Sequence, residues 1–431
     1  MEAATGGRRR RILGARSFLG ILLGAIVALA AALAGGAKTA TPAPETAPHP
    51  TISSRDPIAE AWARALVDPQ PPAPPEATSP VPTNGDSTDS GGPPAAKNAL
   101  RPRRKEAAPP WARPNTGASS ALGVKFPMNP VLPLGKRGSH DSGHAEYPSV
   151  VFVGDTAWMY YSAFGARHHW EIAAAQSTDG IHWTKLGSVI VPDTTTSDWD
   201  SSTIAFPCVL YSAERAPAER FRMWYAGKSG ALYDGIGYAT SPNGRDWVRA
   251  GRALAAGGDG EWDSSQVVDP TVIQVADGYR MYYCGSRDAD GYFQVGLALS
   301  ADGMNWVKSP ENPLVKFEGN PSGAYTLEVL QDPDGYTLFV SLPNSAREFE
   351  IYAMRSADGL TFDPAARQIV LAPSRDGSWD DQMVYGMEAM EIGGQVYLWF
   401  NGIYARSVPK GGEVGLARIA RSELERLFAG P

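Results

Sequence analysis

Three acidic residues lie in stretches that are otherwise apolar and aromatic, in the manner of buried β-strands: Asp269, Glu328 and Glu388. A carboxylate in such a strand is costly to bury unless it is paired or used in chemistry. Carboxyl groups brought together can do acid–base work, because one protonates a leaving oxygen while another acts as a base or a nucleophile. In the structural alternative, the acids form salt bridges with arginines: Arg287, Arg347 or Arg406.

The elements that must position these acids are marked by a recurring phrase. It reads Ser177-Thr-Asp179-Gly180-Ile-His-Trp183, Ser241-Pro-Asn243-Gly244-Arg-Asp-Trp247, Ser300-Ala-Asp302-Gly303-Met-Asn-Trp306 and Ser356-Ala-Asp358-Gly359-Leu-Thr-Phe362. The closing aromatic residues are 64, 59 and 56 residues apart. Such a period indicates a repeat architecture. Asp-Gly and Asn-Gly favour tight hairpin turns, because Gly accepts positive φ and Asp or Asn hydrogen-bonds its own turn.

Each repeat also contains runs of β-forming residues bounded by Gly, Asp and Asn, which predict strands. The turn phrase then leads into a fourth strand. Four strands in each of five units predict an all-β fold, a five-bladed β-propeller of four-stranded antiparallel blades. The fifth unit lacks the turn phrase, so its last strand is expected from residues before the first blade, around Val124 to Val131.

A second recurring feature is an Asp seven residues before the first-strand position held by Pro148, Pro207, Pro270 and Met387. The four residues are Asp141, Asp200, Asp263 and Asp380, and the last three follow a Trp. A carboxylate that recurs in equivalent turns indicates architecture, with a loop tied by hydrogen bonds. We assign that role to Asp200, Asp263 and Asp380.

The Pro position sets a register for the innermost strands. The residues on either side of it are expected to share one strand face. In chain order these pairs are Tyr147/Ser149, Phe206/Cys208, Asp269/Thr271, Thr326/Glu328 and Gly386/Glu388. The register therefore places the three acids on the same kind of face in three consecutive blades.

With five blades, a Trp-Asp before the first strand, an Asp-Pro in one such strand and the Ser-x-Asp-Gly-x-x-Trp turn, the chain resembles the five-bladed propeller glycosidases over roughly residues 124 to 422. These are the arabinanase and xylosidase family, the invertase and levanase family, and relatives that include mannoside phosphorylases. The resemblance implies an active site at one channel mouth with three carboxylates from different blades. One would protonate the leaving oxygen, a second would act as base or nucleophile, and a third would adjust a pKa or hold a hydroxyl.

The first blade departs from the family pattern. In arabinanase-like enzymes the catalytic Asp lies in an Asp-Pro of that blade, whereas this chain has Tyr147-Pro148 there and its Asp-Pro at Asp269-Pro270. Three alternatives stay open. Asp141 or Glu146 serves through a bulge, the acids are redistributed, or catalysis is lost and a sugar-binding propeller remains.

The first blade is also rich in histidine. His140 replaces the Trp of the Trp-Asp pair, His144 follows it, and His168-His169 lies between the second and third strands. Such groups near the channel mouth could hold a sugar hydroxyl, a phosphate or a metal, and aromatic residues there could stack on sugar rings. The predicted substrate-binding residues are His140, Asp141, Glu146, Tyr147, Phe206, Arg287, Tyr325 and Tyr385.

No cofactor is predicted. The stretch Arg287-Asp288-Ala-Asp290-Gly291 faintly resembles a calcium loop, but it lacks a bidentate Glu at the right distance, so a structural calcium has little support. The formal net charge of −7 gives no case for a nucleic-acid partner. Cys208 and Cys284 both lie in strand patterns, where they are buried free thiols or a disulfide pair.

The N-terminus carries Arg8 to Arg11 and then an apolar run from Phe18 to Gly36, so residues 1–36 predict a signal peptide or a membrane anchor. Residues 37–113 are rich in Pro and Ala and predict a disordered linker, with a short helix near Ile58 to Val67. The propeller is expected over 114–431. Either alternative places it outside the cytoplasm: periplasmic, extracellular or membrane-anchored.

The sequence thus predicts an exported glycoside hydrolase that acts on an oligo- or polysaccharide. Glu328 or Glu388 is the expected general acid, and Asp269 the base or nucleophile. The alternative is a non-catalytic propeller that binds carbohydrate or an envelope partner. A phosphorylase is a third possibility, which requires a cationic phosphate site near the acids.

Overall fold

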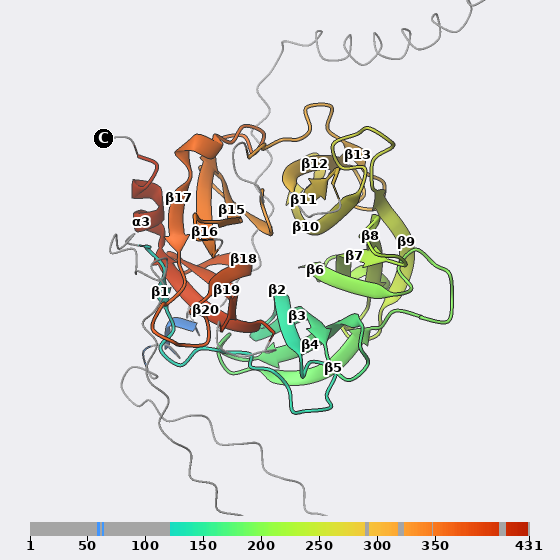
Figure 1. Cartoon of the computed structure of the whole chain (residues 1–431), viewed down its shortest axis with the longest axis horizontal. Helices are drawn as coiled ribbons and strands as arrows, with labels where there is room; N and C mark the ends of the chain where they lie inside the picture. Colours follow the sequence, from blue (N-terminus) through green and yellow to red (C-terminus); the bar gives the residue numbers. More distant parts are fainter. Residues whose placement is uncertain are drawn as a thin grey trace, which may run out of the picture. The chain divides into compact units, whose positions relative to one another are not determined.

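The computed structural model describes residues 58–60, 63, 121–288, 293–317, 323–346, 348–404 and 411–429. Five antiparallel sheets of four strands stand around a central axis (Figure 1), which confirms the predicted five-bladed β-propeller. The innermost strands contact one another in chain order, and the last of them contacts the first.

The strands of each blade follow one another in sequence from the centre outward. Blade 1 contains β2 (His144–Val153), β3 (Thr156–Phe164), β4 (Trp170–Ser177) and β5 (Thr184–Ile190). Blade 2 contains β6 (Thr203–Tyr211), β7 (Phe221–Lys228), β8 (Gly235–Ser241) and β9 (Val248–Ala255). Blade 3 contains β10 (Gln266–Val275), β11 (Gly278–Ser286), β12 (Gln294–Ser300) and β13 (Val307–Lys308). Blade 4 contains β14 (Leu327–Asp332), β15 (Gly335–Pro343), β16 (Phe349–Ser356) and β17 (Gln368–Leu371).

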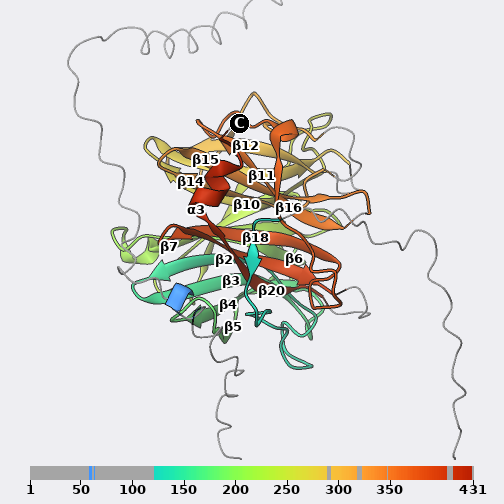
Figure 2. The same ribbon diagram turned by 90° about the vertical axis from the view of Figure 1, so that its left-hand side faces the viewer.

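Blade 5 is built from both ends of the domain. It contains β18 (Met383–Ile392), β19 (Gln395–Ile403) and β20 (Glu413–Ala420), and its fourth strand is β1 (Val124–Lys125). Val124 pairs with Arg418 and Lys125 with Ala417. Figure 2 shows β1 lying along the same blade as β20, and the helix α3 (Arg421–Arg426) follows β20. The prediction that residues near Val124 complete the last blade is confirmed.

The recurring phrase forms one tight turn in each of the first four blades. The Ser hydroxyl accepts the N–H of the Gly, at 2.9 Å between Ser177 Oγ and Gly180 N. The Asp or Asn carboxyl or amide oxygen accepts two further N–H groups, as Asp179 Oδ1 does from Ile181 and His182. The Gly residues have φ between 70° and 83°, so the turn requires their left-handed conformation.

The same turn also holds neighbouring blades together. In each of the four turns the Gly carbonyl accepts a donor from the preceding blade, and in the three turns that end in Trp it also accepts the indole N–H of that Trp. The donors from the preceding blade are Tyr160 to Gly244, Trp224 to Gly303, Tyr282 to Gly359 and Trp399 to Gly180, at 2.8 to 3.0 Å. The phrase is therefore a clasp between blades as well as a hairpin.

The recurring Asp residues are anchors, as predicted for three of them. Asp200 and Asp263 each accept a Tyr hydroxyl from the second strand of the same blade, at 2.8 and 2.9 Å. A basic residue from the fourth strand completes each anchor, with Arg249 on Asp200 and Lys308 on Asp263. In blade 5, Lys125 of β1 binds Asp380 at 2.5 Å.

Of the predicted helix near Ile58 to Val67, residues 58–60 and 63 are described and are helical. Ile58 is fully buried in the core cluster that contains Trp399. Residues 1–57, with the apolar run, and most of the predicted linker lie outside the described residues. Among the residues that are described, no helix is long and apolar enough to cross a membrane. Cys208 and Cys284 are free thiols.

Candidate functional site

Four innermost strands carry a bulge at the position that sets the strand register. Strand pairing shifts between Glu146 and Ser149 in β2, and at the equivalent places in β6, β10 and β18. The bulged residues have left-handed backbones, with φ of 55° at Tyr147 and Phe206, 51° at Asp269 and 50° at Gly386. This conformation costs energy for any residue except Gly, and such strain gathers at functional sites.

The bulges correct one premise of the register prediction. Simple alternation along a strand does not relate the residues before and after the Pro, because the bulge inserts an extra residue between them. Residues from both positions nevertheless line one cavity on the axis of the propeller. Its lining includes Tyr147, Cys208, Asp269, Thr271, Glu328 and Glu388.

This central cavity joins the three predicted acids, which come from blades 3, 4 and 5. Its volume is about 20 Å³, which is room for about one water molecule. Each acidic side chain is half-buried. Within the described part of the chain, none of the three forms a salt bridge with Lys or Arg. Of the predicted arginine partners, Arg287 donates to main-chain carbonyls, whereas Arg347 and Arg406 lie outside the described residues.

Each acid is held by neutral donors. Thr271 Oγ1 donates to Glu328 Oε2 at 2.9 Å, and the Leu327 N–H donates to Asp269 Oδ2 at 2.6 Å. The Glu388 carboxyl accepts the Val150 N–H and the Ser149 hydroxyl. These contacts fix the side chains without neutralising them.

Burial disfavours the charged form of all three acids and raises their pKa values. The pKa of Asp269 rises to about 7, although the Leu327 N–H opposes the rise. The pKa of Glu388 rises to about 8, against its two donors. The pKa of Glu328 rises well above its usual range, because the charges of Glu388 and Asp269 add to burial. The three carboxyl groups therefore form one electrostatic site.

The residues that follow the bulges also connect neighbouring blades, which was not predicted from the sequence. Ser149 Oγ accepts the Val209 N–H at 3.0 Å, and Cys208 Sγ accepts the Val272 N–H at 3.2 Å. Glu388 takes the Val150 N–H in the same way. The residue after the bulge thus ties its blade to the next one, and Glu388 does so with a carboxyl group.

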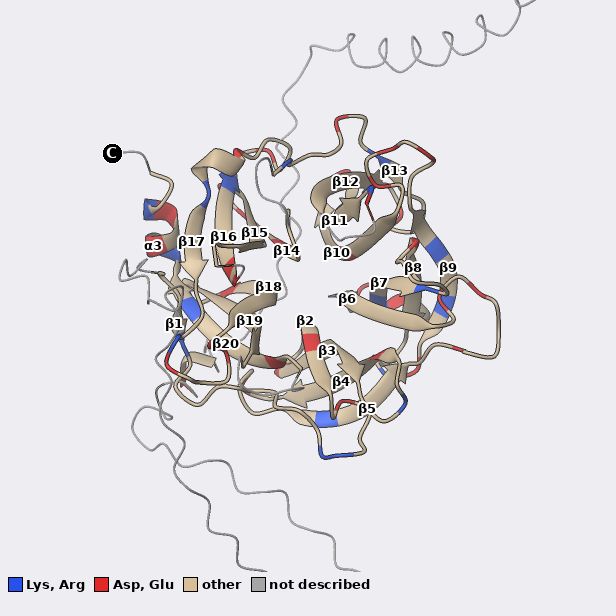
Figure 3. Ribbon diagram, viewed as in Figure 1, with Lys and Arg blue, Asp and Glu red and all other residues tan. Residues whose placement is uncertain are grey.

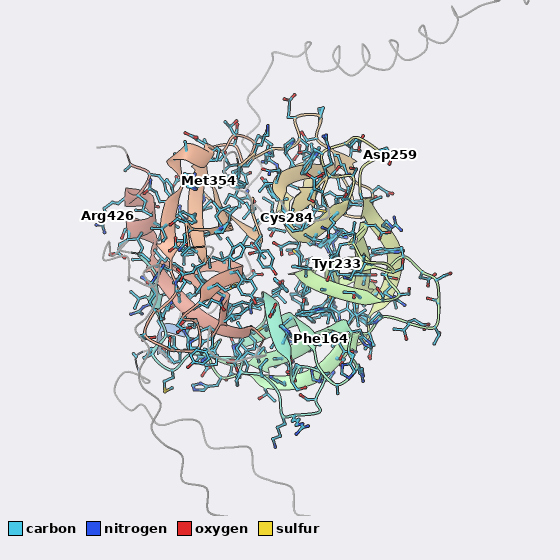
Figure 4. All side chains as sticks on the ribbon, viewed as in Figure 1. Phe164, Tyr233, Asp259, Cys284, Met354 and Arg426 are labelled. Atoms are coloured by element: carbon cyan, nitrogen blue, oxygen red, sulfur yellow. The ribbon has the colours of Figure 1, made fainter. Side chains whose placement is uncertain are left out.

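An aromatic layer lies beside the acids. The ring centroids of Tyr147 and Phe206 are 4.1 Å apart, and Tyr385 lies 5.9 Å from Tyr147 and 5.5 Å from Tyr325. The Tyr147 and Tyr325 hydroxyls are hydrogen-bonded at 3.1 Å. The four predicted aromatic residues are therefore together, and Tyr233, toward the middle of the ring in Figure 4, extends the layer by its contact with Phe206.

Glu146 belongs to a separate network and does not line the central cavity. It is the single acidic residue of β2, whose acidic segment faces the middle of the ring in Figure 3. Its Oε1 accepts the Gly412 N–H at 2.8 Å and lies 2.6 Å from His144 Nδ1. The Tyr385 hydroxyl also donates to Glu146. The structure therefore does not support the alternative in which a bulge brings Glu146 into the cavity as the acid of the first blade.

Three other predicted substrate contacts also lie away from the cavity. Asp141 is buried as the blade 1 anchor, bound by Lys185 at 2.5 Å and Tyr161 at 3.1 Å, so its carboxylate is already occupied. His140 lies beside that anchor, 4.0 Å from Asp141 Oδ2. Arg287 donates to the carbonyls of Gly260 and Glu261.

Asn401 is a site residue that the sequence did not single out. It is fully buried, and its Oδ1 accepts the N–H of the bulged Tyr147 at 2.7 Å. Its amide donates to Ala145 and Glu413 carbonyls at 3.2 Å. The sequence does contain one sign of this residue, because Asn401 is a polar residue directly after the apolar run 396–400. No cluster of metal-ligating side chains occurs in the described ranges.

No protein-family model matches the chain. Two uncharacterized proteins of Mycobacterium tuberculosis are similar, with 31% identity over 202 residues and 27% over 198 residues. The matches cover 44% and 42% of this chain. They span 62% and 60% of the relatives, so the chain covers less than two thirds of their length.

Solved structures of similar fold include several glycoside hydrolases. A glycosyl hydrolase from Bacteroides ovatus matches with a TM-score of 0.53 and 18% identity, over 72% of this chain and 95% of that one. A family 117 glycoside hydrolase from Zobellia galactanivorans matches with a TM-score of 0.51 and 15% identity, over 69% and 90%.

A third match comes from work on the GH130 family of mannoside phosphorylases, described as containing hydrolases that target beta-1,2 mannosidic linkages in Candida mannan. Its TM-score is 0.53 at 18% identity, over 73% of this chain and 96% of that one. At these identities the likeness shows the fold. In fold, the chain resembles the five-bladed propeller glycosidases, as the sequence predicted.

Proposed function

We propose that this protein is a glycoside hydrolase whose acid–base groups are Asp269, Glu328 and Glu388. The observation that carries the proposal is the meeting of three carboxyl groups from three blades in one cavity, with no cation found against them in the described residues. Hydrolysis of a glycosidic bond needs one protonated and one ionised carboxyl group. The proposed substrate is an oligo- or polysaccharide.

The raised pKa values support a division of roles. Burial raises the pKa values of all three acids, so the site can hold protonated carboxyl groups near neutral pH. We assign Asp269, whose pKa is raised by burial without a neighbouring acid among its causes, as the base or nucleophile. Glu388 or Glu328 stays protonated near neutral pH and donates to the leaving oxygen.

We propose that a sugar gains access to the half-buried acids when the neighbouring aromatic layer opens. A cavity of about 20 Å³ does not admit a sugar ring. Phe206 and Tyr325 are half-buried, whereas Tyr385 is 1% exposed. We assign the opening to Phe206 and Tyr325, which would then stack on the sugar.

A non-catalytic carbohydrate-binding propeller is the second candidate. The observation that favours it is that Glu388 occupies a position where Ser149 and Cys208 make purely structural ties between blades. In this alternative the acids close the axis of the propeller, and glycan binds at its surface.

Export is part of the proposal. The basic and apolar residues 1–36 and the Pro-rich residues 37–113 suit a signal or anchor followed by a stalk. The propeller would then meet polysaccharide outside the cytoplasm. Protease accessibility of the propeller in intact cells of a host that expresses the full chain tests this arrangement.

The deciding experiment is a screen of aryl glycosides and of plant and bacterial polysaccharides, with matched variants. Asp269→Asn, Glu328→Gln and Glu388→Gln should each lower kcat/KM by at least about 100-fold, the usual contribution of a general acid or base. Glu214→Gln, an exposed acid on the loop after β6, is the control and should leave the rate unchanged. Activity that survives all three site substitutions would exclude the assignment, and glycan binding without turnover would favour the second candidate.

A further inference from the structure

A second and much larger pocket lies between blades 1 and 2. Its volume is about 660 Å³. Three connections build it: the β3–β4 loop, the β5–β6 loop and the start of the β7–β8 loop. Its lining residues are Arg167, His168, His169, Thr194, Thr196, Ser201, Ser202 and Ser229.

The basic side of this pocket is organised by a buried carboxylate. Glu171 is fully buried, and its Oε2 binds Arg167 Nη1 at 2.7 Å and lies 3.2 Å from His169 Nε2. Its Oε1 accepts the Ser188 hydroxyl at 2.7 Å. About half of the Arg167 side chain stays exposed, at 52%. The guanidinium is therefore held at one end and has donors left for a ligand.

The neighbouring His168 is placed by a left-handed backbone, with φ of 58°. A non-Gly residue in this conformation is uncommon and is worth a functional explanation. No hydrogen bond to its ring is found in the part of the chain described. The loop thus presents a second imidazole beside Arg167 and His169.

Hydroxyl groups form the opposite side. Ser202 donates to the Lys228 carbonyl and Thr196 to the Asp193 carbonyl. The hydroxyls of Thr194, Ser201 and Ser229 have no hydrogen bond within the described residues, and Ser201 is 6% exposed. The lining contains no carboxylate and no phenyl, phenol or indole ring. The Glu171 carboxylate behind the lining is fully buried and already bound to Arg167 and Ser188. A pocket whose lining offers N–H and O–H groups and no carboxylate suits an oxyanion better than a neutral sugar.

The pocket is close to the acid cavity. Trp170 follows His169 directly, and its ring centroid lies 6.3 Å from that of Tyr147, which lines the acid cavity. One aromatic contact, between Trp170 and Tyr147, thus connects the loop that carries Arg167 to the lining of the acid cavity.

We propose that this pocket binds an oxyanion carried by the glycan, either the carboxylate of a uronic acid or a phosphate or sulfate ester. The part of this inference that makes the ligand a glycan rests on the proposed function. Binding of the anion itself requires only Arg167, the two imidazoles and the hydroxyls.

Calorimetric titration of the full chain tests the pocket with four probes: glucuronate, glucose 6-phosphate, inorganic phosphate and glucose. The two anionic sugars should bind and glucose should bind at least 10-fold more weakly. Preference between glucuronate and glucose 6-phosphate distinguishes the two kinds of substituent. Equal binding of glucose, or binding of inorganic phosphate tighter than of both anionic sugars, would overturn the proposal.

Variants make the test independent of catalysis. Arg167→Gln and His168→Ala should each weaken anionic-sugar binding at least 10-fold, and Arg167→Lys should restore part of it. Arg245→Gln, an exposed arginine on the β8–β9 turn, is the control and should change nothing. If Arg167→Gln fails to fold, His168→Ala becomes the deciding variant, because the His168 ring has no hydrogen-bond partner in the described chain. Asp269→Asn should still bind the anionic sugars. Retained binding with lost turnover in this variant would support the anion pocket independently of the acid cavity. Unchanged affinity in His168→Ala would contradict the proposal.

Discussion

At the scale of single residues, the central acids have unequal positions. Glu388 is both a candidate proton donor and the tie that accepts the Val150 N–H. Asp269 accepts the Leu327 N–H while its own backbone is held in a left-handed bulge. Neither residue is placed by an ion pair among the described residues. The structure therefore keeps ionisable groups in a site that favours their neutral forms.

This environment makes stability depend on pH. The folded-state pKa values of Asp269 and Glu388, about 7 and about 8, lie above the usual 3.8 and 4.5, so the folded protein binds more protons than the unfolded chain between about pH 4 and pH 8. Stability must then fall as pH rises through that window. Glu388→Gln, which cannot ionise, should unfold at a higher temperature than the wild type at pH 8. At about 1.4 kcal/mol per pKa unit, the rise from 4.5 to about 8 corresponds to a gain of roughly 4 kcal/mol at pH 8, and the difference should shrink toward pH 4.

Thermal unfolding from pH 4 to pH 9 measures this effect. Glu214→Gln is again the matched control, since that side chain is exposed, and its curve should follow the wild type. A Glu388→Gln curve parallel to the wild type at every pH would show that Glu388 is ionised in the folded protein at neutral pH, against this account.

The sequence could not show why the first blade lacks a cavity acid. The register identified Tyr147 correctly as a member of the axial set, but the side chains of Glu146 and Asp141 depend on contacts with residues far along the chain. Gly412 captures Glu146, and Lys185 with Tyr161 captures Asp141. Such long-range pairing leaves no local signal in a single sequence.

At the scale of the strand and the turn, the Ser-x-Asp-Gly phrase was interpretable because its signals are local. Positive φ at Gly and Asx hydrogen bonding fix the turn from neighbouring residues alone. The bulges of β2, β6, β10 and β18 were not predictable in the same way, since a Pro after Tyr147, Phe206 or Asp269 disfavours helix but does not specify a left-handed backbone. The carbonyl clasp between blades also needed the ring geometry.

The clasp leads to a prediction with an internal control. At Gly244, φ is 76°, and an added Cβ would lie 2.5 Å from the hydroxyl of Tyr160, which is fully buried. At Gly187, φ is 89° and nothing lies within 4 Å of an added Cβ. Both Ala variants incur backbone strain of about 1 kcal/mol, but Gly244→Ala should lose roughly 1–3 kcal/mol more because Tyr160 has to move.

Chemical denaturation of the two variants tests this comparison. Equal losses for Gly244→Ala and Gly187→Ala would mean that the clasp adds nothing beyond turn conformation. Tyr160→Phe, which removes only the donor to the Gly244 carbonyl, separates the hydrogen bond from the packing and should cost about 1 kcal/mol.

At the scale of the whole molecule, the ring depends on β1. Phe126, directly after β1, is 2% exposed, and Lys125 of β1 binds the buried Asp380. Without this segment, β20 would have an unpaired edge and blade 5 would lose its anchor. A chain that starts at residue 128 should therefore be less stable than one that starts at residue 114, by on the order of 3 kcal/mol, and more prone to aggregate.

Both truncated chains lack residues 58–63, so their difference isolates the closing segment. Thermal unfolding and light scattering at matched concentration measure it. Equal unfolding temperatures would show that three strands suffice for blade 5.

The closing pair also governs the time course of folding. Val124 and Arg418 are neighbours in space but lie almost the full length of the domain apart in sequence. Blades 1 to 4 form from contiguous segments, whereas blade 5 needs the two ends to meet across the largest loop in the chain, which carries the largest closure entropy and slows folding. A ribosome releases Arg418 only after all of blades 1 to 4, so blade 5 is completed after them. The strand β1 has to wait, unpaired, until β20 has been synthesised.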